Sequence, residues 1–243
     1  MKISLLGKIL DFLLPRTCAC CGDYLSGNEE MICIKCLFRM PWTNYWEHPY
    51  DNEMAKCFWH LIPIERCSAL YYHVSKTQAA HPIYRLKYGN DPDIGIYLGE
   101  FLGEKGQRYN FFEGIDAIVP IPIARKREKE RGYNQSYIIA KGIQNITHLP
   151  IIRDCVTRTV FVQSQTKKDR LERRINVDQV YRLADAYHDQ YGKHPISHLA
   201  GKHLLIIDDV CTTGATITSC AQELMKAGKM KFSVLTVSFA HSI

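Results

Sequence analysis

The stretch LLIIDDVCTTGAT, residues 204–216, decides the fold of this chain. Its four leading apolar residues form a short run rich in branched side chains, which is typical of a strand buried on both faces. Residues 215–227 have the pattern of a helix, and Gly228 is placed to end it. The stretch therefore predicts a strand that leads through a polar loop into a helix, the repeating unit of a parallel α/β sheet.

The polar part of this stretch follows the predicted strand, at the place where open α/β sheets bind their ligands. A hydroxyl-rich loop that opens a helix presents backbone N–H groups and the positive end of the helix dipole, which favour an anion. Asp208 and Asp209, just before the loop, disfavour an anion and suit sugar hydroxyls or Mg²⁺. These preferences together indicate a ligand of the ribose 5-phosphate type.

These residues resemble the binding motif for phosphoribosyl pyrophosphate (PRPP) in type I phosphoribosyltransferases. The resemblance implies that Asp208 and Asp209 engage the ribose hydroxyls and that the loop holds the 5-phosphate. The loop residues are Thr212, Thr213, Gly214, Ala215 and Thr216. The alternative is a capped turn without a ligand, which we disfavour because adjacent carboxylates at a buried strand end are costly without a partner.

A second polar stretch, residues 119–135 (VPIPIARKREKERGYNQ), follows another predicted strand. Arg125 and Arg131 are candidates to bind pyrophosphate, because the guanidinium fork holds phosphate oxygens bidentately. Arg127 and Lys129 are interpreted as solvent-exposed charges. Residues 121–174 carry 13 Lys or Arg and 5 Asp or Glu, a balance that would attract pyrophosphate, PRPP or nucleic acid.

The stretch from 158 to 176 is basic and rich in hydroxyl and amide groups, which predicts a mobile loop. Closure of such a loop excludes water from the reaction centre, and a cation on it neutralises departing pyrophosphate. The candidates for that cation are Arg158, Lys167 and Lys168, without a choice among them. A solvated loop without this role is the alternative.

The cysteines predict a metal site near the N-terminus. Five of the ten cysteines fall between residues 18 and 36, in two C-x₂-C pairs separated by eleven residues. Each pair supplies two thiolates, and tetrahedral zinc needs four, so we expect a structural zinc site. Its ligands would be Cys18, Cys21, Cys33 and Cys36. Cys20 is left over, and buried free thiols are the alternative.

The length of 243 residues suits one α/β domain of ordinary size with a small appendage. No apolar run reaches the roughly 18 residues of a membrane span. Residues 3–14 are apolar but include Lys8 and Asp11, which predicts an amphipathic helix rather than a secretory signal, and a membrane-surface role is the weaker alternative. We expect a cytoplasmic protein and leave its oligomeric state open.

Strands and helices alternate along the chain, which predicts a parallel sheet with right-handed crossovers. The expected strands are 68–74, 116–119, 151–156, 204–207 and 232–239, and the expected helices 79–88, 93–103, 132–146 and 215–227. We divide the chain into an N-terminal helix and zinc-binding module (1–48), a cover over one end of the sheet (49–113) and a type I phosphoribosyltransferase domain (114–243).

Taken together, the motifs resemble the ComF family of phosphoribosyltransferase-like proteins. In order, they are PRTCACCG (15–22), CIKC (33–36), LKYG (86–89), VPIP with RGYNQ (119–135), an Arg–Gln–Arg–Asn block (158–176) and DDVCTTGAT (208–216). The resemblance implies a type I phosphoribosyltransferase fold and a link to DNA uptake in natural transformation. Some members are described as similar to amidophosphoribosyltransferases.

Two functions follow as expectations. The first is Mg²⁺-dependent transfer of phosphoribosyl from PRPP to an amine or base that no motif identifies. The alternative is a competence factor without catalysis that binds single-stranded DNA or a helicase, for which the basic segment and 14 tyrosines would supply phosphate and base contacts. A weaker hypothesis is that Cys211, beside a helix N-terminus, has a lowered thiol pKa, and the favoured alternative is a loop residue without a chemical role.

Overall fold

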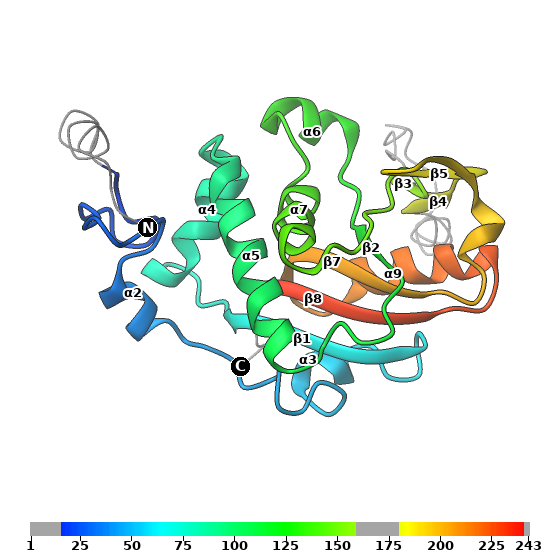
Figure 1. The fold of residues 1–243 in the computed structure, drawn as a ribbon, viewed down its shortest axis with the longest axis horizontal. Coiled ribbons are helices and arrows are strands. Elements are labelled where there is room, and N and C mark those ends of the chain that lie inside the picture. The colour runs from blue at the N-terminus through cyan, green and yellow to red at the C-terminus, as the bar shows by residue number, and fades with distance from the viewer. Residues whose placement is uncertain (1–15, 159–179, 241–243) are drawn as a thin grey trace, which may run out of the picture.

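A parallel sheet of four strands forms the centre of the computed structural model, which describes residues 16–158 and 180–240 (Figure 1). The strands lie in the order β1–β8–β7–β2, and every pair is parallel. Their bounds are β1 Ile64–Tyr72, β2 Ala117–Pro120, β7 His203–Cys211 and β8 Lys231–Phe239. The predicted α/β class with a central parallel sheet is thereby confirmed.

Helices cover both faces of this sheet, as the apolar run of β7 requires. Leu204 and Ile206 pack into one core with α3 (Glu53–Lys56) and α9 (Ala215–Leu224). Leu205 and Ile207 pack into the other core, with α4 (His81–Tyr88), α5 (Pro92–Arg108) and α7 (Gln135–Thr147). Successive side chains of a strand point to opposite faces, so burial on both sides needs an unbroken apolar run. The short helix η3 (Met225–Ala227) continues α9 to Gly228, as predicted.

The strand order reverses direction between β2 and β7. After β2 the chain passes through α7 and returns to the outer side of β2, where Ile151 bridges Ile118 in parallel. After β7 it passes through α9 to β8, on the opposite side. A reversal of this kind opens a crevice at the carboxyl ends of the two strands, which is the usual ligand site of open α/β sheets.

Residues 49–113, which were expected to cover one end of the sheet, also contribute a strand to it. Their strand β1 is longer than predicted and pairs with β8 from Ile64↔Phe232 to Tyr72↔Phe239, so it is the edge strand of the central sheet. This part of the chain therefore contributes backbone hydrogen bonds to the sheet. The division of the chain into three parts stays a prediction.

Close contact between α5 and α7 joins this region to the rest of the chain, and Figure 1 shows the two helices side by side. A Cβ atom at Gly99 would lie 2.1 Å from the carbonyl oxygen of Ile139, and one at Gly142 would lie 2.2 Å from that of Ile96. Only glycine lets the two backbones approach this closely. The helices are therefore packed backbone against backbone at this crossing.

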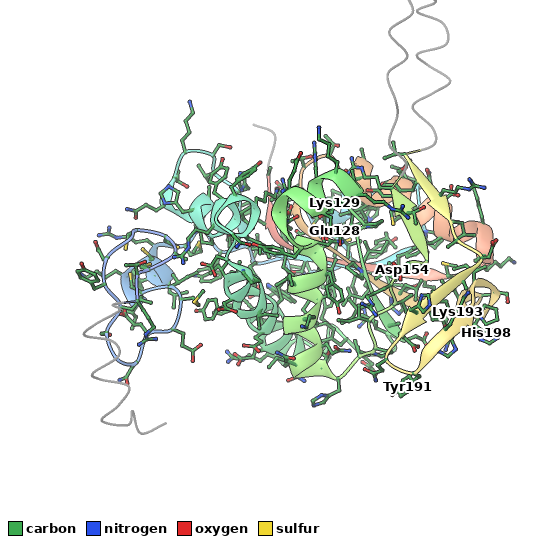
Figure 2. The ribbon with its side chains drawn as sticks, turned by 90° about the horizontal axis from the view of Figure 1, so that it is seen from above. Glu128, Lys129, Asp154, Tyr191, Lys193 and His198 are labelled. Carbon is green, nitrogen blue, oxygen red and sulfur yellow. The ribbon has the colours of Figure 1, made fainter. Side chains whose placement is uncertain are left out.

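The stretch after β2 differs from the prediction. Residues expected as a loop form a short helix, α6 (Arg125–Arg131), which ends at Gly132 with a φ of +79°. The next helix, α7, therefore begins at Gln135 and not at Gly132, and the Asn134 side chain caps it by accepting from the Ser136 N–H. No residue of α6 is buried. Figure 2 shows Glu128 and Lys129 on this helix.

Smaller elements complete the described chain. They are α2 (Ile34–Arg39), η1 (Gln78–Ala80), η2 (Ile196–Leu199), and the antiparallel pairs β3 (Val156–Arg158) with β4 (Tyr181–Leu183) and β5 (Ala186–Asp189) with β6 (Gly192–Pro195). In place of the predicted strand 151–156, Ile151 bridges Ile118, Arg153 bridges His188, and Val156 begins β3.

Two predictions lie outside the described residues: the helix at 3–14, and the loop that carries Lys167 and Lys168. Among the residues that are described, no helix combines the length and apolarity needed to cross a lipid bilayer.

Candidate functional site

Four thiols gather in the N-terminal module, as predicted. The sulfur atoms of Cys18, Cys21, Cys33 and Cys36 all lie within 4.8 Å of one another. The Sγ atoms of Cys21 and Cys33 are 3.8 Å apart, and ligands of a tetrahedral zinc ion with bonds of about 2.3 Å stand at about that spacing. This geometry fits a closed zinc site with four cysteine ligands.

Backbone N–H groups surround one sulfur atom of this cluster, that of Cys18. Burial alone would raise the pKa of Cys18, but N–H groups of Cys33, Cys21 and Cys20 point at its sulfur and lower the pKa to about 6. Burial and the nearby Cys18 charge raise the pKa of Cys20 to about 12. The thiolate form that a metal binds is therefore favoured at Cys18, whereas Cys20 stays a thiol.

The predicted phosphate loop connects β7 to α9 at the crevice. A small pocket is lined by residues 208 and 210–217, which include the whole of the loop. Thr212, Thr213, Ala215 and Thr216 are exposed there, at the N-terminus of a ten-residue helix. Unpaired N–H groups and the helix dipole favour an anion at such a place.

Gly214 caps α9 in a conformation that suits glycine. Its φ is +75°, and a Cβ atom there would lie 2.7 Å from the Phe58 ring and 3.2 Å from the Cys57 Cβ atom. Cys57 and Phe58, at the end of α3, thus pack closely against the loop, and any side chain at position 214 would displace them. The close packing holds the loop tightly against the protein core.

Asp208 is half-buried and held by two donors. The Ser136 hydroxyl donates to its Oδ1 atom over 3.0 Å, and the Asp209 N–H donates to the same atom over 2.9 Å. Burial and the charge of Asp209 nevertheless raise the pKa of Asp208 to about 7, against the effects of these donors and of Lys87. The carboxyl group of Asp208 therefore gains or loses its proton close to neutral pH.

Asp209 forms an ion pair with Lys87. The Lys87 Nζ atom lies 2.9 Å from Asp209 Oδ1, and the two side chains are 22% and 12% exposed. Lys87 belongs to the last turn of α4, which follows the edge strand β1 in the chain. Lys87 thus places a positive charge beside the acidic pair. It belongs to the region that was expected to cover the sheet.

Lys87 also lines a basic cavity of about 770 Å³ between the end of α4 and α6. The other lining residues are Tyr88, Asn90, Arg127, Lys129, Glu130, Arg131 and Gly132. Arg131 was predicted to bind an anion, and it donates to Gln135 Oε1 over 2.8 Å. Arg127 and Lys129 were interpreted as solvent-exposed charges, and they too border this cavity.

Two other predicted anion ligands lie apart from this cavity. Arg125 is exposed at the start of α6 and is not among the lining residues. Arg158, on β3, places its guanidinium 5.8 Å from the centre of the Tyr181 ring. Burial raises the pKa of Tyr181, and Asp208 adds to the rise while Arg158 opposes it. Both Arg158 and Asp208 are thus close enough to Tyr181 to influence its hydroxyl.

The hypothesis about Cys211 is wrong. Burial and the neighbouring Cys57 and Asp208 raise the pKa of Cys211, and the Gly214 N–H offsets only part of that rise. Cys211 is 2% exposed and packs with the core beneath the loop. Desolvation exceeds the influence of the helix terminus here, so the thiol is unreactive.

Lys87 and Ser136 were not among the residues predicted for the site. Lys87 stands inside the LKYG motif, and Ser136 directly follows RGYNQ, so motif membership was the available signal. Their contacts with the two aspartates join residues far apart in the chain, which spacing along the sequence does not reveal.

The strand order, the reversal at β2 and β7, and the loop after β7 define an open α/β fold with a central parallel sheet, beside a module of four clustered cysteines. In sequence, the chain is similar to curated competence and DNA-utilization proteins, which agrees with the resemblance of its motifs. A comparison with family models finds no match.

Competence protein ComFC of Bacillus subtilis is 32% identical over 112 residues, which cover 46% of this chain and 39% of that protein. DNA utilization protein YhgH of Escherichia coli strain K12 is 28% identical over 149 residues, 60% of each chain. Competence protein F of Haemophilus influenzae is 27% identical over 119 residues, 49% of this chain and 48% of that one. The matches thus span about two fifths to three fifths of these relatives.

Among solved structures, that of Leishmania donovani UMP synthase aligns with 70% of this chain and 28% of its own, at 13% sequence identity and a TM-score of 0.33. We draw no functional conclusion from a likeness at that level.

Proposed function

We propose that the crevice between β2 and β7 binds PRPP or a related ribose phosphate. The observation that carries the proposal is the adjacency of an anion-favouring loop, an acidic pair and a basic cavity. The loop residues 212–216 would hold the 5-phosphate, Asp208 and Asp209 the ribose hydroxyls, and Arg131 with its cavity neighbours the diphosphate.

The reaction we propose is transfer of the phosphoribosyl group to an amine or base nitrogen. The bond from C1 to the diphosphate oxygen breaks, and the diphosphate leaves with the electron pair. The acceptor nitrogen forms the new bond to C1 and loses its proton to solvent. The side chains would act by positioning and charge stabilisation, without a covalent nucleophile. Lys167 and Lys168 remain proposed contributors to diphosphate departure.

Mg²⁺ would enter with the ligand. Carboxylate, hydroxyl and phosphate oxygens are the ligands that Mg²⁺ prefers, and the ion would offset repulsion between the acidic pair and the diphosphate. Zinc would have a separate and structural role, since a site with four cysteine ligands has no open position for a substrate.

The test of this function is isothermal titration of the full chain with PRPP in the presence of Mg²⁺, beside a variant with Asp208→Asn and Asp209→Asn. We expect saturable binding by the unaltered protein and a loss of about tenfold or more in the variant. Binding that is equal in both proteins contradicts the assignment of the acidic pair, and no binding in either contradicts the function. Mass spectrometry of PRPP with a pool of amines and bases tests transfer.

A second candidate, binding of single-stranded DNA, is favoured by one surface. Tyr84 and Tyr88 stack with ring centres 6.5 Å apart, and the Arg131 guanidinium lies 5.2 Å from the centre of the Tyr88 ring. Tyr88 is 72% exposed and Tyr84 43% exposed. Aromatic rings beside cations are what unpaired bases and their phosphates bind. The names of the relatives, competence and DNA-utilization proteins, support a role with DNA.

This candidate is tested by fluorescence anisotropy with a labelled oligonucleotide at several salt concentrations. Loss of stacking in a Tyr88→Ala variant should lower affinity by about fivefold or more, since a base on an aromatic ring contributes roughly 1–3 kcal/mol. Tyr191→Ala is the matched control, because Tyr191 is 77% exposed on the distant β5–β6 hairpin (Figure 2). Equal affinities of the two variants would contradict this surface.

A further inference from the structure

Lys87 stands between the two parts of the site that a ribose diphosphate would occupy. On one side its ammonium group is 2.9 Å from Asp209 Oδ1. On the other side it lines the basic cavity together with Arg127, Lys129 and Arg131. Among the described residues, only Lys87 both contacts the acidic pair and lines that cavity.

The backbone around Lys87 is held in place by neighbouring residues. The Tyr133 hydroxyl donates to the carbonyl oxygen of Leu86 over 2.7 Å, and Arg85 forms an ion pair with Asp91 just past the helix. The last turn of α4 is therefore fixed at both sides of Lys87. Its flexible side chain can still exchange one anionic partner for another without movement of the helix.

The ion pair with Asp209 competes with ribose. A ribose hydroxyl that donates to Asp209 has to share or displace the ammonium group, and a partly buried ammonium without a partner is costly. A diphosphate in the adjacent cavity offers such a partner. Ribose 5-phosphate has no diphosphate. It would separate Lys87 from Asp209 without offering the ammonium group another anionic partner.

We propose that Lys87 makes the site selective for ribose phosphates that carry a diphosphate at C1, because it exchanges Asp209 for the diphosphate when the ligand binds. This inference rests on the proposed function and adds a specificity-determining residue to it. Lys87 acts here as a ligand-binding residue whose anionic partner changes from Asp209 to the diphosphate.

The test compares Mg²⁺-PRPP with Mg²⁺-ribose 5-phosphate by isothermal titration of the full chain and of Lys87→Met. We expect PRPP affinity to fall about tenfold or more, because a charge-assisted contact is lost, while ribose 5-phosphate affinity stays within about threefold. Lys87→Arg should recover most of the selectivity. Lys126→Met, which removes a charge from α6 outside the cavity lining, should leave the ratio of the two affinities unchanged.

The ratio of affinities separates this inference from its alternatives. If both ligands weaken equally in Lys87→Met, or if neither does, the role of Lys87 is overturned while the proposed function stands. If the unaltered protein binds both ligands equally well, the selectivity itself is overturned. If it binds neither, the proposed function and this inference fail together. Partial unfolding of a variant lowers the stoichiometry for both ligands and leaves their ratio interpretable.

Discussion

The Tyr133 hydroxyl donates a hydrogen bond of 2.7 Å to the carbonyl oxygen of Leu86 and so ties the RGYNQ motif to the LKYG motif. Tyr133 and Leu86 are 47 positions apart in the chain. This bond closes one wall of the basic cavity, because Tyr133 follows Gly132 and Leu86 precedes Lys87, and both of those neighbours line it.

Tyr133→Phe should lower the free energy of unfolding by about 1 kcal/mol, since it leaves a partly buried carbonyl group without its donor. Urea denaturation followed by circular dichroism measures this change. Tyr137→Phe is the matched control, because Tyr137 lies nearby in the first turn of α7 and the Arg153 guanidinium is 5.6 Å from the centre of its ring. A loss no larger than that of the control would show that the bond does not stabilise the fold.

Cys36→Ser should abolish zinc binding, whereas Cys20→Ser should retain it. Only the first removes one of the four sulfur atoms that lie within 4.8 Å of one another. Elemental analysis after dialysis checks both proteins, with one zinc ion per chain expected for the unaltered protein and for Cys20→Ser. Zinc retained in Cys36→Ser, or lost in Cys20→Ser, would contradict the assignment of the ligands.

Gly214→Ala should destabilise the protein by about 1–3 kcal/mol through backbone strain, and by more through its contact with Phe58. Gly201→Ala separates the two effects. Gly201 has a φ of +79°, close to the +75° of Gly214, but nothing lies within 4 Å of its added Cβ atom. Thermal unfolding of both variants should therefore show the larger loss for Gly214→Ala. Equal losses would mean that packing against Phe58 does not constrain the loop.

Asp208→Asn should raise stability more at pH 8 than at pH 5. Burial and Asp209 raise the pKa of Asp208 in the folded protein to about 7, above its unfolded value, so the folded state binds more protons between these pH values. The charged carboxylate thus costs stability as the pH rises, and asparagine removes that cost. The increase in the free energy of unfolding caused by Asp208→Asn should be larger at pH 8 than at pH 5, by an amount on the order of 1 kcal/mol. Denaturation at the two pH values measures this difference.

Asp116→Asn provides the contrast in the same experiment. Burial would raise the pKa of Asp116, but the Lys202 ammonium and the His203 N–H lower it overall. Stability from a lowered carboxyl pKa is complete above the unfolded value, so this variant should lose similar amounts at pH 5 and pH 8. A pH-independent effect of Asp208→Asn would contradict the raised pKa.

The strand, loop and helix from 204 to 227 could be predicted because their signals are local. Apolar residues, two aspartates and a glycine follow one another in the order in which the elements form. The four cysteine ligands were equally accessible, because two short pairs at a fixed spacing specify their own geometry.

Helix α6 could not be found from hydrophobic periodicity, because it buries none of its residues and so has no apolar stripe. The position of β1 at the sheet edge was missed for a different reason. Its partner β8 lies at the other end of the chain, and the pairing of distant strands leaves no mark on either segment alone.

The same limit applies to the site. Each aspartate was evident from its motif, but the partners of both come from elsewhere, Ser136 from α7 and Lys87 from α4. The burial of Asp208 and its closeness to Asp209 are properties of the folded chain, and they raise the pKa of Asp208 against the opposing effects of Ser136 and Lys87.

The glycine crossing of α5 and α7 bears on how this protein can move. Two helices whose backbones touch at Gly99 and Gly142 have no layer of side chains between them that could shear. We expect the two helices, one before and one after residue 114 in the chain, to move as one rigid unit. An opening or closing of the crevice therefore requires movement elsewhere. Helix α6 buries no side chain and ends at Gly132, so we expect such a movement to involve this helix.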